Sequence, residues 1–279
     1  MRIVMQVDLD STLGCKQAHR WFKKDGRWEG VLNKRVVTLT QTDDGFDCEG
    51  IDRDTILDYF RADDDLDAIY EDCASKDGYV ASLIQRCRGL RILRQPHWEC
   101  IATYILATNA NVKRISMMIE NVCRQFGDRV GDYYAFPDPE QIVAGRDRLP
   151  LCRLGFREGR LLKFAEDVME GRFDPDSLEG LSYEDCVSRL MEINGVGPKV
   201  ADCVALFSYG HMQAFPIDAR IGAILKDVYG QEGSYKRLSA FAREKFGEYC
   251  GYSQEFLYHS EGINGSQVQA GGSHPNSTS

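Results

Sequence analysis

The chain has 279 residues, 43% hydrophobic and 28% charged, which is enough for one large domain or two smaller ones with a real core. Its net charge of −9 argues against a uniformly basic nucleic-acid-binding protein, and no apolar run approaches the roughly 18 residues of a membrane span. The first residues, MRIVMQVDLD, carry acids early and lack an apolar core, so we expect no secretory signal and an intracellular protein, either cytoplasmic and nucleoid-associated or nuclear.

Residues 2–50 have the pattern of strands in an antiparallel meander. The stretch VLNKRVVTLTQTDDGFDCEG is rich in β-branched residues, alternates partially, and contains candidate turns at Asn33-Lys34 and Asp44-Gly45. From Asp54 the apolar residues recur at helical spacing instead. We therefore expect a β-rich N-terminal domain at residues 1–95.

The charge is distributed unevenly along the chain. Residues 43–77 hold 14 acids and three bases, a net of −11, so the rest of the chain carries +2. Residues 146–163 hold six bases and two acids. A local basic face of this kind can bind phosphate groups although the whole molecule is acidic, and a solvated helix face is the alternative.

From Tyr79 onward the pattern is almost wholly helical, and many segments end at glycine. Ser182, which precedes Glu184 and Asp185, is a candidate N-cap. The sequence predicts an α+β protein with a helical domain at residues 96–260 and a disordered Gly/Ser/Asn-rich tail at residues 261–279.

The ten cysteines form no C-x-x-C pair and mostly lie in apolar runs. We expect reduced, buried thiols and no metal or iron–sulfur site, because such sites need clustered ligands.

The stretch INGVGPKVADC, from Ile193 to Cys203, predicts a helix–hairpin–helix turn at about residues 190–200. Gly195 and Gly197 allow the backbone to approach a ligand, and Pro198 suits the first turn of a helix. Their amides, with that of Lys199, would converge on an anion such as a phosphate.

Lys199 lies in the first turn of the second helix, where the helix dipole disfavours a positive charge. That field and burial are both expected to lower its pKa, and a neutral amine is a nucleophile. A phosphate-binding or solvated lysine stays open as the alternative. In AFPIDARI, Asp218 can cap the next helix and also stabilise a cationic sugar carbon, whereas a cap alone is the simpler alternative.

LMEINGVGPKVADCVALF and AFPIDARI resemble the helix–hairpin–helix DNA glycosylase superfamily, and the 8-oxoguanine DNA glycosylase/AP lyase branch is the closer match. Four further segments resemble that branch: KQAHRWF with WEGVLNKRVVTLTQT, RILRQPHWECIATYILATNANVKRI, LGFREGR and YCGYSQEFLYHS. The resemblance covers residues 2–260.

The resemblance implies a role for each matching residue. Lys199 would be the Schiff-base nucleophile and Asp218 the carboxylate that supports the oxocarbenium-like state. The base pocket would be formed by Cys203, Gln254, Tyr258 and the Lys16 carbonyl. Asn109, Arg114 and Arg157 would read the orphaned cytosine while Phe156 fills the gap in the stack. Gly195, Gly197 and Arg220 would contact DNA phosphates.

Two positions depart from the family pattern: Lys16 replaces a glycine, and Arg220 replaces a histidine. We expect a bifunctional glycosylase/AP lyase of base excision repair that removes 8-oxoguanine opposite cytosine from double-stranded DNA, without a cofactor, as a monomer. A glycosylase for another damaged base, or a non-catalytic DNA-binding module, remains the alternative. A metal–sulfur enzyme is disfavoured by the dispersed cysteines.

Overall fold

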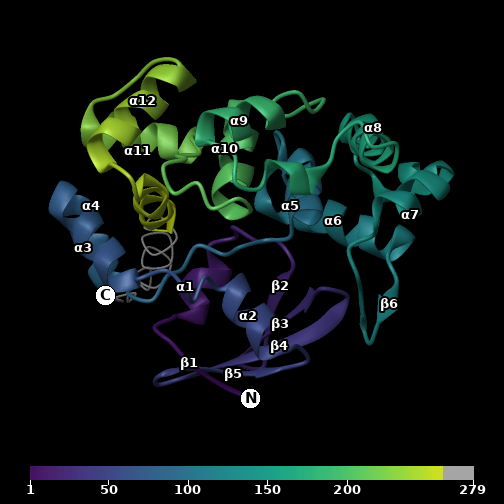
Figure 1. The fold of residues 1–279 in the computed structure, drawn as a ribbon, viewed down its shortest axis with the longest axis horizontal. Coiled ribbons are helices and arrows are strands. Elements are labelled where there is room, and N and C mark those ends of the chain that lie inside the picture. The colour runs from purple at the N-terminus through teal and green to yellow at the C-terminus, as the bar shows by residue number, and fades with distance from the viewer. Residues whose placement is uncertain (260–279) are drawn as a thin grey trace, which may run out of the picture.

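The computed structural model describes residues 1–259, and the tail expected at residues 261–279 lies outside this range. A sheet with two short helices forms one end of the molecule and a larger group of helices forms the other (Figure 1). The α+β class is therefore confirmed, with the antiparallel sheet first in the chain. Within the described range, no helix has the length and apolar character needed to cross a membrane.

The N-terminal sheet has five antiparallel strands: β1 (Arg2–Val4), β2 (Trp21–Lys24), β3 (Arg27–Leu32), β4 (Arg35–Thr42) and β5 (Gly45–Glu49). Their order is β1-β5-β4-β3-β2, so four strands form the expected meander and β1 pairs with β5. Asn33 and Lys34, with φ of 49° and 60°, form the expected turn between β3 and β4. The next turn lies at residues 43–44, because Gly45 already pairs within β5.

One segment of residues 2–50 is helical, so the expectation of strands throughout is wrong there. α1 (Leu9–Gly14) begins after Asp8, whose side chain accepts a hydrogen bond from the Ser11 amide at 2.6 Å. Leu9 and Leu13, one turn apart, are fully buried. An N-cap and an i, i+4 apolar pair therefore decide the structure of this segment.

The helices that follow have the periodicity expected from the sequence, and Ser182 caps α9 as predicted, accepting a hydrogen bond from the Asp185 amide at 3.1 Å. The segments are α2 (Arg53–Tyr59), α3 (Leu66–Lys76), α4 (Gly78–Arg86), α5 (His97–Ala107), α6 (Val112–Phe126), α7 (Pro139–Ala144), α8 (Arg157–Met169), α9 (Tyr183–Leu190), α10 (Pro198–Phe207), α11 (Ala219–Tyr229), α12 (Tyr235–Phe246) and a helix at residues 250–259. Two 3₁₀ helices, η1 (Arg146–Cys152) and η2 (Pro175–Leu178), and a short hairpin, β6 (Arg129–Val130) with β7 (Tyr133–Tyr134), interrupt them.

Two hydrophobic cores underlie this arrangement. The smaller one joins the sheet to α1 and α2. The larger one joins the later helices and also includes buried residues of α3 and α4, which lie beside α11 and α12 in Figure 1. Side-chain packing thus groups residues 66–92 with the helical part, and the domain boundary at residues 95 and 96 stays a prediction.

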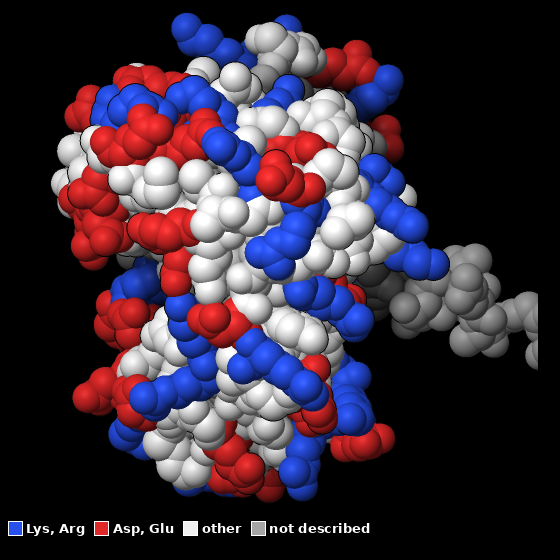
Figure 2. Space-filling model, turned by 90° about the vertical axis from the view of Figure 1, so that its right-hand side faces the viewer, with Lys and Arg blue, Asp and Glu red and all other residues white. Residues whose placement is uncertain are grey.

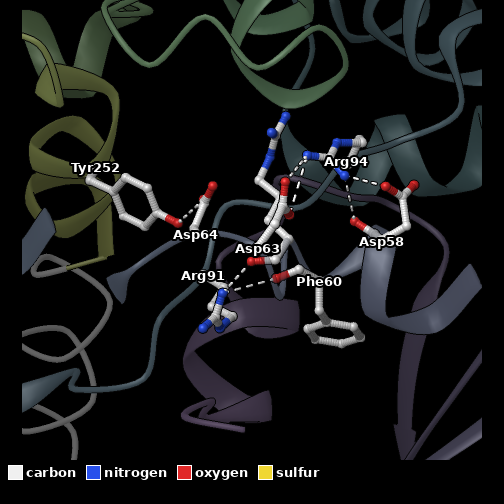
Figure 3. A network of polar contacts seen from close by, with 8 residues as sticks. Asp58, Phe60, Asp63, Asp64, Arg91, Arg94 and Tyr252 are labelled. Atoms are coloured by element: carbon white, nitrogen blue, oxygen red, sulfur yellow. Dashed lines mark hydrogen bonds and ion pairs between the residues drawn. The ribbon is translucent and has the colours of Figure 1, made fainter. Parts of the chain in front are cut away.

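Part of the acidic stretch at residues 43–77 holds the extended segment 90–96 that links the two cores (Figure 3). Arg94 pairs with Asp58 and with Asp63. The Tyr252 hydroxyl donates to Asp64 at 3.0 Å. Because Asp58 and Asp63 are largely exposed, each pair contributes at most about 1 kcal/mol, and together they fix the path of the segment.

Candidate active site

The expected helix–hairpin–helix is present: a turn at residues 191–197 joins α9 to α10. Gly195 has φ of +90°, and a Cβ atom there would lie 2.4 Å from Cδ of Arg160, so the backbone conformation favours glycine, and a larger residue would also displace the Arg160 side chain. Gly197 is extended and precedes Pro198, the first residue of α10. The first-turn amides of α10, which lack acceptors within the helix, lie where the sequence predicts an anion site.

Lys199 lies in the first turn of α10, and its Nζ atom is 5.5 Å from the ring centroid of Tyr104 on α5. Negative charge on Cys203, then on Asp218 and Glu255, raises the pKa of Lys199, although burial acts in the opposite direction. The expectation that this pKa is lowered is therefore wrong. The largest contribution comes from Cys203, one turn later on the same helix, and the charges of Asp218 and Glu255, which other helices bring to the site, add to it.

Cys203 lies one turn after Lys199 and is 3% exposed. Burial raises the pKa of its thiol to about 11, although Lys199 opposes this, so the thiol is neutral near pH 7. At that pH the negative neighbours of Lys199 are the carboxylates of Asp218 and Glu255.

Asp218 is the N-cap of α11, as the sequence predicts, and its Oδ1 atom accepts a hydrogen bond from the Ile221 amide at 2.9 Å. Its charge also acts on Lys199. The first turns of α10 and α11 therefore bring a lysine amine and a carboxylate into one site.

Two of the residues expected to form a base pocket interact with this pair, Cys203 with Lys199 and Tyr258 with Asp218. Gln254 is 4% exposed, and its Oε1 atom has no hydrogen-bond partner within residues 1–259. Tyr258 packs against Arg220, with 4.6 Å between the guanidinium carbon and the ring centroid. Lys16 has φ of +70°, a conformation that favours glycine, so its backbone is glycine-like although its side chain is not.

Glu255 interacts with Lys199 and Asp218 as well, although no pattern in the sequence predicted it. It is 3% exposed, and its Oε2 atom has no hydrogen-bond partner in the described residues. Burial raises the pKa of Glu255 to about 7, although a hydrogen bond with Cys15 and the charge of Lys199 lower it. The sequence feature that could have indicated its burial is its position as a single acid among the apolar residues of YSQEFLY.

His19 was also missed, and it connects Lys16 with the lysine site. Its ring centroid lies 6.0 Å from that of Tyr104. Burial, followed by the positive charges of Lys199 and Lys16, lowers the pKa of His19 to about 4. The imidazole is therefore neutral near pH 7.

A second group of expected residues gathers at the start of α8. Phe156 is 54% exposed, and the guanidinium carbons of Arg157 and Arg160 lie 4.3 and 4.8 Å from its ring centroid. Burial and the charges of Arg114 and Arg160 lower the pKa of Arg157. Two guanidinium groups therefore pack against one exposed aromatic ring, and Arg114 adds a third positive charge that acts on Arg157.

Arg157 itself is turned inward and is 3% exposed. Its guanidinium donates to the carbonyl oxygens of Thr108, Asn109 (3.0 Å) and Leu154 (3.2 Å). Asn109 is exposed and has φ of +51°. Arg157 thus supports the turn that presents Asn109, and its own contact with a base stays a prediction.

Figure 2 shows the side of the molecule on which α7, α8 and the β6–β7 hairpin lie. Lys and Arg side chains are numerous in the middle and on the right of this face, and Asp and Glu are most frequent along its left margin, although both kinds occur elsewhere on it. Among residues 1–259, no cluster of His, Cys, Asp and Glu could hold a metal ion, and the ten cysteines are buried and unpaired.

Several known proteins resemble this chain in sequence and in fold. Residues 3–101 match the family model "8-oxoguanine DNA glycosylase, N-terminal domain". The chain is 27% identical to N-glycosylase/DNA lyase OGG1 of Arabidopsis thaliana, with 92% of this chain and 78% of that protein covered. It is 29% identical to the N-glycosylase/DNA lyase of Saccharomyces cerevisiae, with 92% and 84% covered.

Solved structures extend the similarity to the whole fold. The structure of MBOgg1 in complex with a low-affinity DNA ligand is 32% identical, covers 95% of both chains and gives a TM-score of 0.89. The Clostridium acetobutylicum 8-oxoguanine glycosylase/lyase in complex with double-stranded DNA containing cytosine opposite 8-oxoG is 26% identical, covers 93% of both chains and gives 0.87.

Proposed function

We propose a residue-level mechanism for this chain on the premise that it belongs to the 8-oxoguanine DNA glycosylase family. The chain is a DNA N-glycosylase with lyase activity, which excises 8-oxoguanine from double-stranded DNA in base excision repair. The alternative of a non-catalytic DNA-binding module is set aside, because relatives named as N-glycosylase/DNA lyases cover almost the whole chain. The intracellular location and the monomeric state stay predictions.

The reaction begins with the damaged nucleotide flipped out of the stack, since C1′ and the base edge are inaccessible within a duplex. The Nζ atom of Lys199 attacks C1′, and the C1′–N9 bond breaks with its electron pair leaving on the base. Opening of the sugar ring gives a Schiff base between Lys199 and C1′. β-Elimination from this intermediate then cleaves the strand.

Asp218 stabilises the positive charge that develops on the sugar as the glycosidic bond breaks. The observation that carries the proposal is that Lys199 and Asp218, from the first turns of successive helices, act on each other within one site. A pure DNA-binding hairpin needs neither group.

The pocket residues would select the base by stacking and by hydrogen bonds. Cys203 and Tyr258 would pack on its two faces, and the free Oε1 atom of Gln254 would accept a hydrogen bond from its Watson–Crick edge. The glycine-like backbone at Lys16 supports the proposal that its carbonyl oxygen meets N7–H, the donor that distinguishes 8-oxoguanine from guanine.

The residues gathered at the start of α8, together with the hairpin and Arg220, would contact the rest of the duplex. Phe156 would fill the gap left by the flipped nucleotide, as apolar wedges do in bent DNA. Asn109, Arg114 and Arg157 would read the orphaned cytosine. The phosphates would be held by the Gly195 and Gly197 amides and by Arg220.

Borohydride trapping on a duplex with 8-oxoguanine opposite cytosine tests the mechanism. The wild type should form a covalent adduct and release the base, whereas Lys199→Gln should do neither while still binding DNA. The proposal fails if the wild type gives no adduct or if Lys199→Gln still gives one.

A further inference from the structure

Glu255 is a buried acid whose hydrogen-bonding capacity is not used up by the fold. It lies in the 250–259 helix, directly after Gln254, and is 3% exposed. Its Oε2 atom has no partner among the described residues. An ionised, under-bonded carboxylate in such a place costs free energy, so its presence calls for a reason in the reaction or in the fold.

Glu255 interacts electrostatically with the reacting lysine and with several groups near it. The ionisable groups that interact with it come from the segment after α1, from α5, α10 and α11, and from its own helix: Cys15, Tyr104, Lys199, Cys203, Asp218 and Tyr258. Lys199 is the one base in this set. Each of the two groups influences the other, since Lys199 favours the ionised form of Glu255 and Glu255 favours the ammonium form of Lys199.

The proposed mechanism requires this lysine to lose a proton. An ammonium group has no lone pair with which to attack C1′. The pKa of Lys199 is raised, so Nζ is protonated near pH 7. A proton acceptor within the site is therefore needed before the C–N bond can form.

We propose that the Glu255 carboxylate accepts the Nζ proton of Lys199 and so generates the neutral amine that attacks C1′. This inference rests on the proposed function, because it assigns the proton acceptor for the same nucleophile. It adds to the site a residue that the pattern of the sequence did not point to.

The protons and electrons balance through the step. The proton moves from the Lys199 ammonium group to Glu255, leaving a neutral amine and a neutral carboxyl group. The Nζ lone pair then bonds to C1′ while the C1′–N9 pair leaves with the base. The departing base anion takes the proton from the Glu255 carboxyl group, which restores the carboxylate, and the positive charge stays on the alkylated nitrogen.

The other groups around Nζ are less suited to this role. The Asp218 Oδ1 atom already accepts the Ile221 amide and helps to begin α11. The Cys203 thiol, with a pKa of about 11, is already protonated near pH 7. His19, with a pKa of about 4, holds a proton poorly. Glu255, with a pKa of about 7, is partly ionised near pH 7 and basic enough to hold the proton that it accepts.

Single-turnover excision from an 8-oxoguanine duplex, measured between pH 5.5 and 9, tests the proposal. The wild-type rate should rise with pH and level off above about pH 7, as Glu255 ionises. Glu255→Gln should be about 100-fold slower at pH 7, in the range of lost general-base catalysis. Its rate should keep rising towards pH 9, because solvent must then remove the proton.

Two further variants make the result specific. Glu248→Gln is the matched control, because it makes the same change at an exposed residue just before the helix and should follow the wild-type profile. Glu255→Asp keeps a carboxylate, so it should recover part of the lost rate and level off again. It also serves as the readout if Glu255→Gln folds poorly.

Equal rates for wild type and Glu255→Gln at pH 7 would overturn the proposal. A loss of the same size at every pH would also overturn it, because that pattern indicates a structural role. Borohydride trapping separates this failure from failure of the mechanism itself. If the wild type forms the adduct and Glu255→Gln forms it equally fast, the role of Glu255 is wrong while that of Lys199 stands.

Discussion

Two buried carboxylates, Asp202 and Glu255, differ in how many of their oxygens the fold supplies with hydrogen-bond donors. Asp202 on α10 is 2% exposed and accepts hydrogen bonds from the Tyr183 hydroxyl at 2.6 Å and the Tyr235 hydroxyl at 2.5 Å. Glu255, at 3% exposed, has an oxygen with no partner in the described residues. Burial raises the pKa of both.

The difference separates a structural acid from a reactive one. Tyr183 on α9 and Tyr235 on α12 tie α10 to its neighbours through Asp202, and Arg243 donates to the Tyr183 hydroxyl at 3.2 Å. That network holds the helix that carries Lys199. Glu255 holds no element in place to the same degree and keeps an oxygen available for a proton.

The largest effect on stability is expected from replacing Asp202, the structural acid. Asp202→Ala removes the acceptor of two buried hydroxyl groups, so it should lower the free energy of unfolding by roughly 2–6 kcal/mol, measured by urea denaturation. Asp227→Ala, at an exposed position of α11, should change it by about 0.5 kcal/mol or less. Equal stabilities for the two variants would remove Asp202 from its structural role.

Asp218→Asn should slow base excision while leaving the fold intact. Asparagine caps helices as well as aspartate does, so the unfolding transition should stay close to that of the wild type. The loss of the negative charge should slow base excision by about 100-fold to 1,000-fold. Fluorescence anisotropy should show retained DNA binding, and unchanged turnover would mean that Asp218 is only a helix cap.

Glu255→Gln should change stability in the direction opposite to Asp202→Ala. The pKa of Glu255 is raised from its ordinary value of 4.5 to about 7, so its contribution to stability is full below pH 4.5 and lost as pH rises through 7. The neutral variant avoids this loss. Its stability relative to wild type should increase by on the order of 3 kcal/mol between pH 4.5 and pH 8, measured by chemical denaturation. A pH-independent difference would contradict the raised pKa.

The smallest effect is expected at Arg114, whose proposed contact is with a base rather than with the reacting atoms. Arg114→Ala should reduce the preference for cytosine opposite the lesion by about 1–3 kcal/mol, seen as excision rates across the four opposite bases. Arg124→Ala, on the same helix and paired with Glu120, is the control and should keep the wild-type ratios. If Arg114→Ala also keeps them, its assignment to the cytosine fails.

Local patterns in the sequence predicted those features of the fold and the site that depend on a few adjacent residues. Asp218 and Ser182 cap their helices, the turn at Asn33 and Lys34 forms, and Gly195 takes its positive φ. Each of these depends on a few adjacent residues. The same reasoning failed at α1, where a cap and an apolar pair outweigh the surrounding strand pattern.

Properties that depend on distant residues were not accessible in this way. The sign of the pKa shift at Lys199 was mispredicted because it depends first on Cys203, one turn along the same helix, and then on Asp218 and Glu255, which other helices bring to the site. Glu255 and His19 were overlooked because their burial becomes visible only after the helices pack. The burial of Arg157 against the carbonyl oxygens of residues 108 and 109 depends likewise on a distant segment, and its role in reading a base stays a prediction.

Peptide mapping of the borohydride-reduced adduct tests the central assignment most directly. Mass spectrometry of the digested wild-type adduct should place the sugar remnant on the peptide that contains Lys199, and fragmentation should locate it on Nζ of that residue. Lys16, whose charge acts with that of Lys199 on His19, should be unmodified and serves as the internal control. A remnant on Lys16 or on the Met1 amine, with Lys199 unmodified, would contradict the assignment of Lys199 as the nucleophile.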